Sequence, residues 1–226
     1  MIQGELNLEE TNDNLIVLEG YFTEQPIFSH VIFGEDFYVA PLSVDRLSDS
    51  KDILNITISS KLLKDIELKG DVYTRITGQL RSYNKLSGNK NKLLLTVFAK
   101  EISFPVEKAE EPNLILLTGF VCKEPVYRQT PFGREITDLL IAVNRQFNKT
   151  DYIPVLAWGR NAKFSKMFKV GEKIHVQGRL QSRTYDKIIE DGTLIKKTAY
   201  EVSSSLIDLL EENEDDSTID ETMTVS

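Results

Sequence analysis

Three aromatic side chains of this chain each have an arginine two residues away: Phe147 beside Arg145, Trp158 beside Arg160, and Tyr185 beside Arg183. Residues two apart on a β-strand project from the same face. An exposed aromatic ring can stack on any nucleic-acid base, and a guanidinium group can pair with a phosphate. The spacing therefore predicts a surface that binds single-stranded nucleic acid without reading its sequence. Burial in a core is the alternative role for each ring, because aromatic side chains fill much of a small domain.

The charge of the chain is unevenly distributed. Its 226 residues carry 27 Lys and Arg against 35 Asp and Glu, and the net charge of −8 alone argues against a nucleic-acid partner. Residues 206–226, however, hold eight acids and no base, and residues 1–105 have a net charge of −4. Residues 113–205 carry 15 bases and 9 acids. Within this basic region we expect phosphate contacts from Arg128, Arg134, Arg145, Lys149, Arg160, Arg179, Arg183 and Lys187.

The chain contains an internal repeat. Asn14–Gly20 (NLIVLEG) matches Asn113–Gly119 (NLILLTG), and ten of 33 aligned pairs are identical over positions 14–46 at an offset of 99. Gly78–Ser82 matches Gly178–Ser182 at an offset of 100. A period near 100 residues indicates a duplicated domain rather than a solenoid. We expect four segments: an N-terminal copy over 1–105, a linker over 106–112, a C-terminal copy over 113–207 and an acidic disordered tail over 208–226.

Each copy shows a β-rich pattern with one short helix. In the second copy, strands are expected over 114–122, 136–143, 152–158, 173–183 and 193–207, and a helix over 161–168. The first copy repeats this order with its helix over 59–66. Three strands, a helix and two strands form the order of the five-stranded OB barrel, so we predict an all-β protein of two tandem OB folds. A β-sandwich is the alternative, but it would need about seven strands and no helix in that position.

Residues 113–207 resemble the bacterial single-stranded-DNA-binding protein (SSB) family. The resemblance rests on an ordered set of segments: Asn113–Gly119, Glu124–Pro125, Gly133, Leu140–Arg145, Tyr152–Gly159, Lys169–Gly171 and Val176–Ser182. Each segment is weak by itself, and their order across a whole domain is the specific feature. The first copy resembles the same family more faintly.

The resemblance implies four stacking aromatic residues, and each position holds an aromatic here: Phe147, Tyr152, Trp158 and Tyr185. Three of them are Phe or Tyr where the family favours Trp, which predicts weaker stacking. Ile153 stands where many members have a histidine in a subunit contact. The family also implies homodimers of such duplicated chains, with four OB folds per assembly.

The first copy departs from this pattern. The equivalents of Phe147, Tyr152 and Trp158 are Ser48, Ile53 and Ser59. Its remaining candidate contacts are Arg46, Arg81, Tyr83 and Lys85. We therefore expect this copy to bind DNA weakly and to serve in dimerisation or in contact with another protein.

The acidic C-terminal segment is a further family-like feature. In the family such a tail ends in an apolar tip with a terminal Phe that recruits replication and repair proteins, whereas this chain ends Met223-Thr-Val-Ser226. Recruitment of replication and repair proteins remains an expectation, with a purely solubilising tail as the alternative.

Other classes of function have little support in the residues. One cysteine excludes a disulfide framework and a multi-cysteine metal cluster, and two histidines leave little material for a histidine-ligated metal. The sequence contains no Gly-rich phosphate loop, no G-x-S-x-G motif and no Cys/His constellation, so neither catalysis nor a cofactor is expected. No apolar run reaches the length of a membrane span. We therefore predict a cytoplasmic, nucleoid-associated protein that is not an enzyme and that binds single-stranded DNA in replication, recombination or repair. An OB-fold adaptor in a primosome-like or phage assembly is the alternative.

Overall fold

The structure is a computed structural model that describes residues 13–64, 66, 68, 70–87, 90–188 and 193–210. The side chains of 85–87, 90–92 and 187–188 lie outside the described part, as does the tail beyond residue 210. No helix in the described residues is long and apolar enough to cross a membrane.

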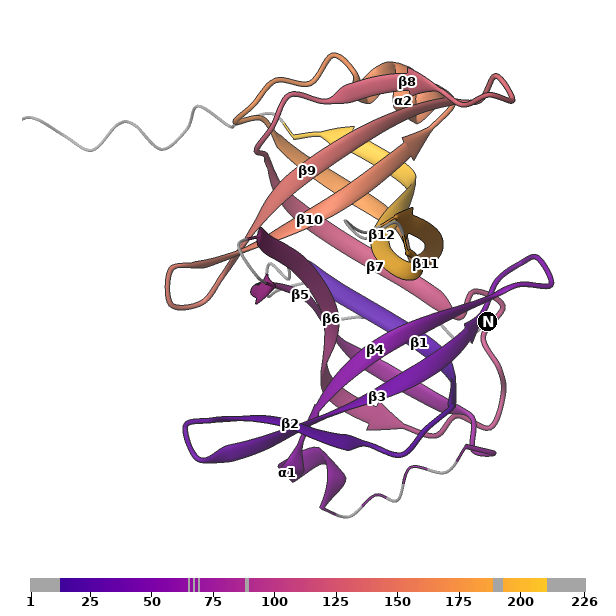
Figure 1. Cartoon of the computed structure of the whole chain (residues 1–226), viewed down its shortest axis with the longest axis vertical. Helices are drawn as coiled ribbons and strands as arrows, with labels where there is room; N and C mark the ends of the chain where they lie inside the picture. The colour runs from indigo at the N-terminus through magenta and orange to yellow at the C-terminus, as the bar shows by residue number, and fades with distance from the viewer. Residues whose placement is uncertain are drawn as a thin grey trace, which may run out of the picture.

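Strands dominate both halves of the chain (Figure 1). The first half contains β1 (Asn14–Phe22), β2 (Ile27–Ile32), β3 (Glu35–Asp45), β4 (Lys51–Ser59), α1 (Ser60–Leu63), β5 (Thr74–Ser87) and β6 (Lys90–Ser103). The second half contains β7 (Asn113–Val121), β8 (Val126–Gln129), β9 (Glu135–Arg145), β10 (Lys149–Trp158), α2 (Arg160–Ser165), β11 (Lys173–Ile188) and β12 (Leu194–Leu209).

The strand pairings are the same in both halves. In the first half β1 pairs with β3, β3 with β4, β4 with β6, β6 with β5 and β5 with β1, so five strands return on themselves. In the second half β7, β9, β10, β12 and β11 pair in the same cyclic order. Each half has one further strand, β2 in the first and β8 in the second, which pairs at an outer edge of the sheet.

These edge strands correct the expected element count. The sequence predicts a turn between the first and second strands of each copy, and the structure instead forms short hairpins, β2–β3 and β8–β9. Both edge strands are solvent-exposed for most of their length and so lack the alternating burial that marks the core strands. The helices are also shorter than expected, because Phe168 turns into the core after α2 has ended at Ser165.

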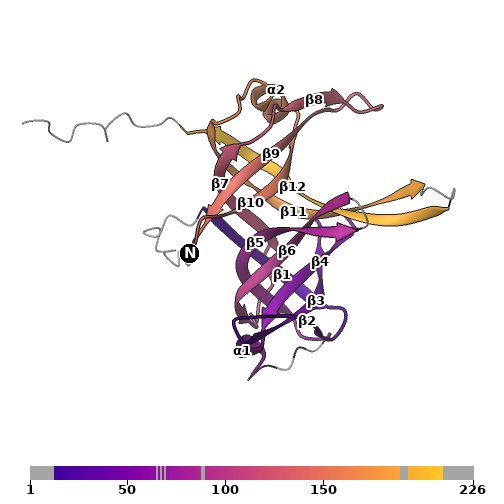
Figure 2. The same cartoon turned by 60° about the vertical axis from the view of Figure 1, so that its left-hand side comes forward.

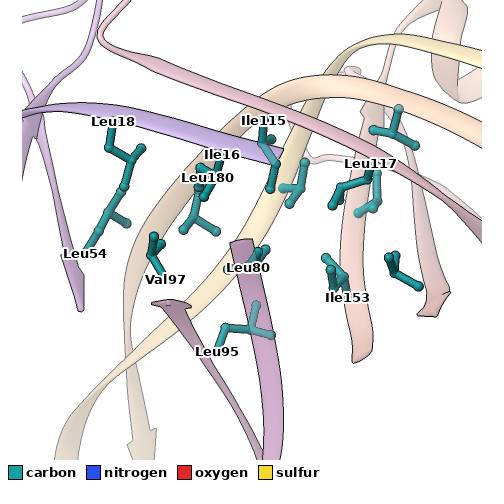
Figure 3. Packing of buried hydrophobic residues seen from close by; sticks show 14 of the residues in the cluster. Ile16, Leu18, Leu54, Leu80, Leu95, Val97, Ile115, Leu117, Ile153 and Leu180 are labelled. Carbon is teal, nitrogen blue, oxygen red and sulfur yellow. The ribbon is translucent and has the colours of Figure 1, made fainter. Parts of the chain in front are cut away.

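Alternating apolar residues fill the interior. In β10, for example, Ile153, Val155 and Ala157 are buried, while Tyr152 and Trp158 lie on the opposite face. Most of the buried hydrophobic residues, from both halves, belong to one hydrophobic cluster (Figure 3). Ile153, which replaces a family histidine, is part of this cluster.

The two halves meet in one continuous sheet. β1 and β7 pair antiparallel with Ile16 opposite Ile115, two residues that occupy equivalent positions in the repeat. Asn14 and Asn113 each bind the backbone of a leucine in their own half, Leu80 and Leu180, through the same pair of hydrogen bonds. The junction therefore has approximate twofold symmetry.

Two buried aspartates join the halves reciprocally. Asp52 in β4 accepts hydrogen bonds from the Ser182 backbone N–H at 2.6 Å and from its hydroxyl at 3.1 Å. Its equivalent in the second half, Asp151, accepts one from the Ser82 backbone N–H at 2.6 Å. Both carboxylates are fully buried. We call this pair of aspartates and the serine residues they bind the aspartate clasp.

Glycines shared by the two copies stand where strands press closely together. A Cβ on Gly178 would lie 2.2 Å from the Ser203 carbonyl oxygen, and one on Gly78 would lie 2.2 Å from that of Phe98. The strand register shifts at both positions, between Gln177 and Gly178 and between Thr77 and Gly78. The repeat preserves these glycines because a side chain has no room there.

Candidate nucleic-acid interface

β10 carries two of the four expected stacking residues on one face. Tyr152 and Trp158 are six residues apart on this strand, an even number, and both project from the outer face while the intervening odd positions are buried. The Tyr152 side chain is 44% exposed. Its backbone N–H donates to the Ser82 hydroxyl at 2.8 Å, which places this aromatic at the junction between the halves.

Phe147 lies in the turn between β9 and β10 and is 90% exposed. Its φ of 64° and that of Asn148, 53°, are both in the left-handed region. The turn separates Phe147 from the alternation of β9, so the same-face argument for Phe147 and Arg145 does not hold. A ring this exposed makes no contribution to the core and is available to a ligand.

Trp158 forms one wall of an open groove of about 630 Å³. The groove is lined by Gly133, Arg134, Glu135, Trp158, Gly159, Arg179, Gln181 and Ser203. The Trp158 Nε1–H donates to the Ser203 hydroxyl at 3.2 Å, which fixes the orientation of the indole. A flat ring beside two arginines can hold a base and a phosphate at the same time.

The β11–β12 hairpin extends beyond the other strands of the second half (Figure 2). The fourth aromatic, Tyr185, lies on β11 in this hairpin, opposite Lys197 of β12. Its side chain is 37% exposed. The Arg183 guanidinium lies over the Tyr185 ring, 5.5 Å from its centroid, so the two side chains do share a face as their spacing predicts.

The residues predicted to contact phosphates fall into those with an ion-pair partner and those without one. Three arginines already have a carboxylate partner: Arg128 pairs with Asp138, Arg145 with Asp151, and Arg183 with Glu201. In the part of the chain that the structure describes, no ion pair occupies the other four: Arg134, Lys149, Arg160 and Arg179. The Lys187 side chain lies outside the described part. Arg134 and Arg179 line the Trp158 groove. Arg160 begins α2 after Gly159, which has a φ of 54°, so it does not continue β10 and the same-face argument for Trp158 and Arg160 does not hold.

Two of the candidate DNA contacts in the first half, both arginines, instead bind the buried aspartates at the junction between the halves. Arg46 holds Asp52 with two hydrogen bonds, at 2.6 and 2.8 Å, and Arg81 donates to Asp151 at 3.2 Å. The bond to Asp52 raises the pKa of the Arg46 guanidinium, so this charge is committed within the protein. Tyr83 is 51% exposed, and the Lys85 side chain lies outside the described part.

The carboxylate in the groove, Glu135, is already bound by neighbouring side chains. Glu135 accepts a hydrogen bond from the Tyr127 hydroxyl at 2.6 Å and pairs with Lys163 at 3.0 Å. The hydrogen bond from Tyr127 is the largest cause of the lowered pKa of Glu135, and the bond from Lys163 lowers that pKa further. The same Tyr127–Glu135 hydrogen bond is the largest cause of the raised pKa of Tyr127. The groove therefore keeps a positive character despite the carboxylate.

Aromatic residues outside the four family positions differ in their burial. Phe168 is buried, whereas Phe164 is 42% exposed and packs edge-on against Phe168. Tyr127 lies half-exposed on β8 with Lys166 4.9 Å from its ring centroid. Sequence analysis passed over Phe132, which is 91% exposed in the turn after β8. The sequence feature that could have indicated its exposure is its position in a Pro-Phe-Gly turn directly before an arginine.

The described residues contain no group of His, Cys, Asp and Glu side chains that could hold a metal ion. A second opening, of about 270 Å³, lies at the junction of the halves beside Asp52, Arg46, Glu111 and Arg179. It adjoins the Trp158 groove, since Arg179 and Ser203 line both.

Comparisons with known proteins bear on the half that carries this groove. The family model described as "Single-strand binding protein family" matches residues 112–210. The chain is 36% identical over 107 residues to single-stranded DNA-binding protein 1 of Clostridium acetobutylicum, which is 44% of this chain and 94% of that protein. It is also 35% identical over 88 residues to the single-stranded DNA-binding protein of Clostridium tetani, and there it covers 59% of the relative's length and 36% of its own.

A solved structure extends the likeness across both halves. The wild-type single-stranded DNA binding protein from Thermus aquaticus matches with a TM-score of 0.70 at 20% identity, over 88% of this chain and 94% of that one. At this identity the match concerns the fold alone. Together with the family model and the C. acetobutylicum relative, the comparisons lead to one conclusion: the chain belongs to the single-strand binding protein family.

Proposed function

We propose that this chain binds single-stranded DNA without sequence preference, in replication, recombination or repair, and that its second half supplies the binding face. The observation that carries the proposal is the Trp158 groove, where a fixed indole stands beside Arg134 and Arg179, which are free of ion pairs among the described residues. Phe147, Tyr152 and Tyr185 extend the exposed aromatic surface from this groove toward the junction and onto the β11–β12 hairpin. Bases stack on the rings, and the unpaired cations take the phosphates.

The proposed architecture is two tandem OB folds over 1–105 and 113–207, joined by a linker over 106–112. Five strands that pair cyclically in each half support it. The acidic segment 208–226 follows as a tail that solubilises the chain and competes with DNA for the basic face. Nearly all of this segment lies outside the described residues, and its acids are its supporting feature.

We assign the first half a structural role in binding. It lacks three of the four stacking residues, and Arg46 and Arg81 are held by the aspartate clasp. Because the clasp and the β1–β7 pairing tie the halves together, the division of labour is tested by point variants of the whole chain rather than by isolated halves. A homodimer with four OB folds and contacts with replication or repair proteins complete the proposal.

The test uses the single tryptophan as its probe. Titration with oligo(dT) at low salt should quench Trp158 fluorescence, and raising the salt should weaken binding with a log–log slope of about −0.7 for each phosphate contacted. Arg134→Ala and Arg179→Ala should each lower that slope by about one contact. Absence of both quenching and a mobility shift in the wild-type chain would refute the proposal.

One observation favours the adaptor as a second candidate. The edge strand β2 contains no charged residue and exposes Ile27, Phe28, Val31 and Ile32. An exposed apolar edge strand can pair with a strand of another protein. A chain that binds a protein partner through β2 and fails to bind oligo(dT) would favour this function over the first.

A further inference from the structure

The turn between β8 and β9 presents an aromatic residue that the four family positions do not include. Phe132 is 91% exposed at its tip. The turn is well defined, since the Thr130 N–H donates to the Arg134 carbonyl at 2.8 Å and the Gly133 N–H donates to the Thr130 carbonyl at 2.8 Å. The Thr130 hydroxyl also accepts from the Arg134 N–H at 3.1 Å. Phe132 is therefore held on a fixed support rather than on a long loop.

This turn forms part of the Trp158 groove. Gly133 and Arg134, the two residues that follow Phe132, line the groove together with Trp158 and Gly159. Gly133 has a φ of 75° and open space around the place of a Cβ, so the backbone there leaves room for a ligand. Phe132 does not itself line the groove, but the two residues that follow it do, so the exposed ring lies next to the groove that Trp158 lines.

The charges in the groove beside Phe132 favour the binding of a phosphate. In the described part of the chain Arg134 has no carboxylate partner, and neither has Arg179 within the groove. Glu135, the carboxylate that lines the groove, is already bound by Tyr127 and Lys163. Aromatic rings close to unpaired cations suit the alternation of base and phosphate along a single strand.

We propose that Phe132 is a fifth stacking residue, which holds the base next to the one on Trp158 while Arg134 and Arg179 bind the phosphate between them. This inference rests on the proposed function. It adds a position through which the bound DNA strand passes, at the turn between β8 and β9. It also assigns a purpose to the β8–β9 hairpin.

The internal repeat provides a matched control. Phe33 occupies the equivalent turn of the first half, is fully exposed and precedes a glycine with a φ of 77°. Its surroundings differ, because Glu35 and Asp36 follow that turn and the equivalent of Trp158 is Ser59. Phe33 itself has a φ of 49°, unlike Phe132, so the control matches Phe132 in ring type and exposure rather than in backbone conformation, and it lacks the nearby arginines and the indole.

The experiment compares Phe132→Ala and Phe33→Ala in the full chain, by titration with oligo(dT) at fixed low salt. Because the Phe132→Ala variant loses the stacking of one base, it should bind oligo(dT) roughly 5- to 150-fold more weakly than the wild type, with little change in the salt slope. The Phe132→Tyr variant keeps an aromatic ring and should retain most of the affinity. Phe33→Ala should bind like the wild type. Circular dichroism melting of both variants shows whether each is folded.

The outcomes separate the inference from the proposed function. Wild-type affinity in Phe132→Ala, with a loss in Trp158→Ala, overturns the inference and leaves single-stranded DNA binding in place. Equal losses in Phe132→Ala and Phe33→Ala also overturn it, because the effect would then not depend on the groove. A wild-type chain that does not bind oligo(dT) refutes the proposed function itself.

Discussion

The aspartate clasp gives the most direct test of how the two halves are held together. Asp52 is fully buried and accepts two hydrogen bonds from Arg46 and two from Ser182, which is 130 residues away in the chain. Replacement by asparagine retains the shape but removes the charge and turns an N–H toward groups that are themselves donors. We therefore expect Asp52→Asn to destabilise the whole protein while leaving the local strand pattern unchanged.

The size of the effect follows from burial. Breaking a buried ion pair by removing one partner costs about 3–5 kcal/mol. Arg46 keeps 24% of its side chain exposed and can recover some hydration, so the lower end, about 3 kcal/mol, applies here. In a protein of this size 1 kcal/mol shifts Tm by about 2–4 °C, so Tm should fall by about 6–12 °C.

Differential scanning calorimetry measures this shift, with Asp138→Asn as the control. Asp138 also pairs with an arginine, Arg128, but both side chains are about half exposed, and such pairs are worth about 0–1 kcal/mol. The control should therefore lose less than about 4 °C. Equal Tm values for Asp52→Asn and Asp138→Asn would refute the reasoning that burial makes the clasp important.

Three further predictions concern the binding face and the fold. Tyr152→Ala should weaken oligo(dT) binding roughly 5- to 150-fold, whereas alanine at its repeat equivalent, Ile53, should leave binding unchanged; fluorescence titration of both variants checks this. Gly178→Ala should lower Tm more than Gly133→Ala, because the first forces a Cβ against a carbonyl at 2.2 Å while the second meets only an unfavourable φ; comparable melting curves would contradict the crowding argument. The lowered pKa of Glu135 means that its stabilising effect is complete above the ordinary carboxyl pKa and is lost as the pH falls through the lowered value. Glu135→Gln should accordingly reduce the difference in Tm between neutral and acidic pH, and an unchanged difference would count against this assignment.

The repeat was visible in the sequence for a physical reason. Residues such as Gly78 and Gly178 recur because strands cross too closely there for a side chain, and Asn14 and Asn113 recur because each binds the backbone of its own half. Alternation of apolar residues likewise located the core strands, since a strand buries every second side chain. The edge strand β8 was missed because it is exposed and carries no such pattern.

The candidate site could be predicted only in part. The positions of the aromatic residues followed from the family resemblance, and their roles stay predictions until binding is measured. The state of the nearby cations did not follow from the sequence. Arg145 and Arg134 look alike as basic residues near an aromatic, yet Arg145 faces the buried Asp151 and Arg134 lines an open groove. A count of charges cannot distinguish the two.

By itself, the sequence determined the order of the five core strands in each half, the internal repeat and the placement of positive charge in residues 113–205, because each of these depends on local composition and spacing. Tertiary structure alone decided that β1 pairs with β7, that Asp52 reaches Ser182, and which arginines remain unpaired. These features join residues far apart in the chain. Their energies depend on burial and on distances of a few ångströms, which exist only after the strands have closed and the halves have met.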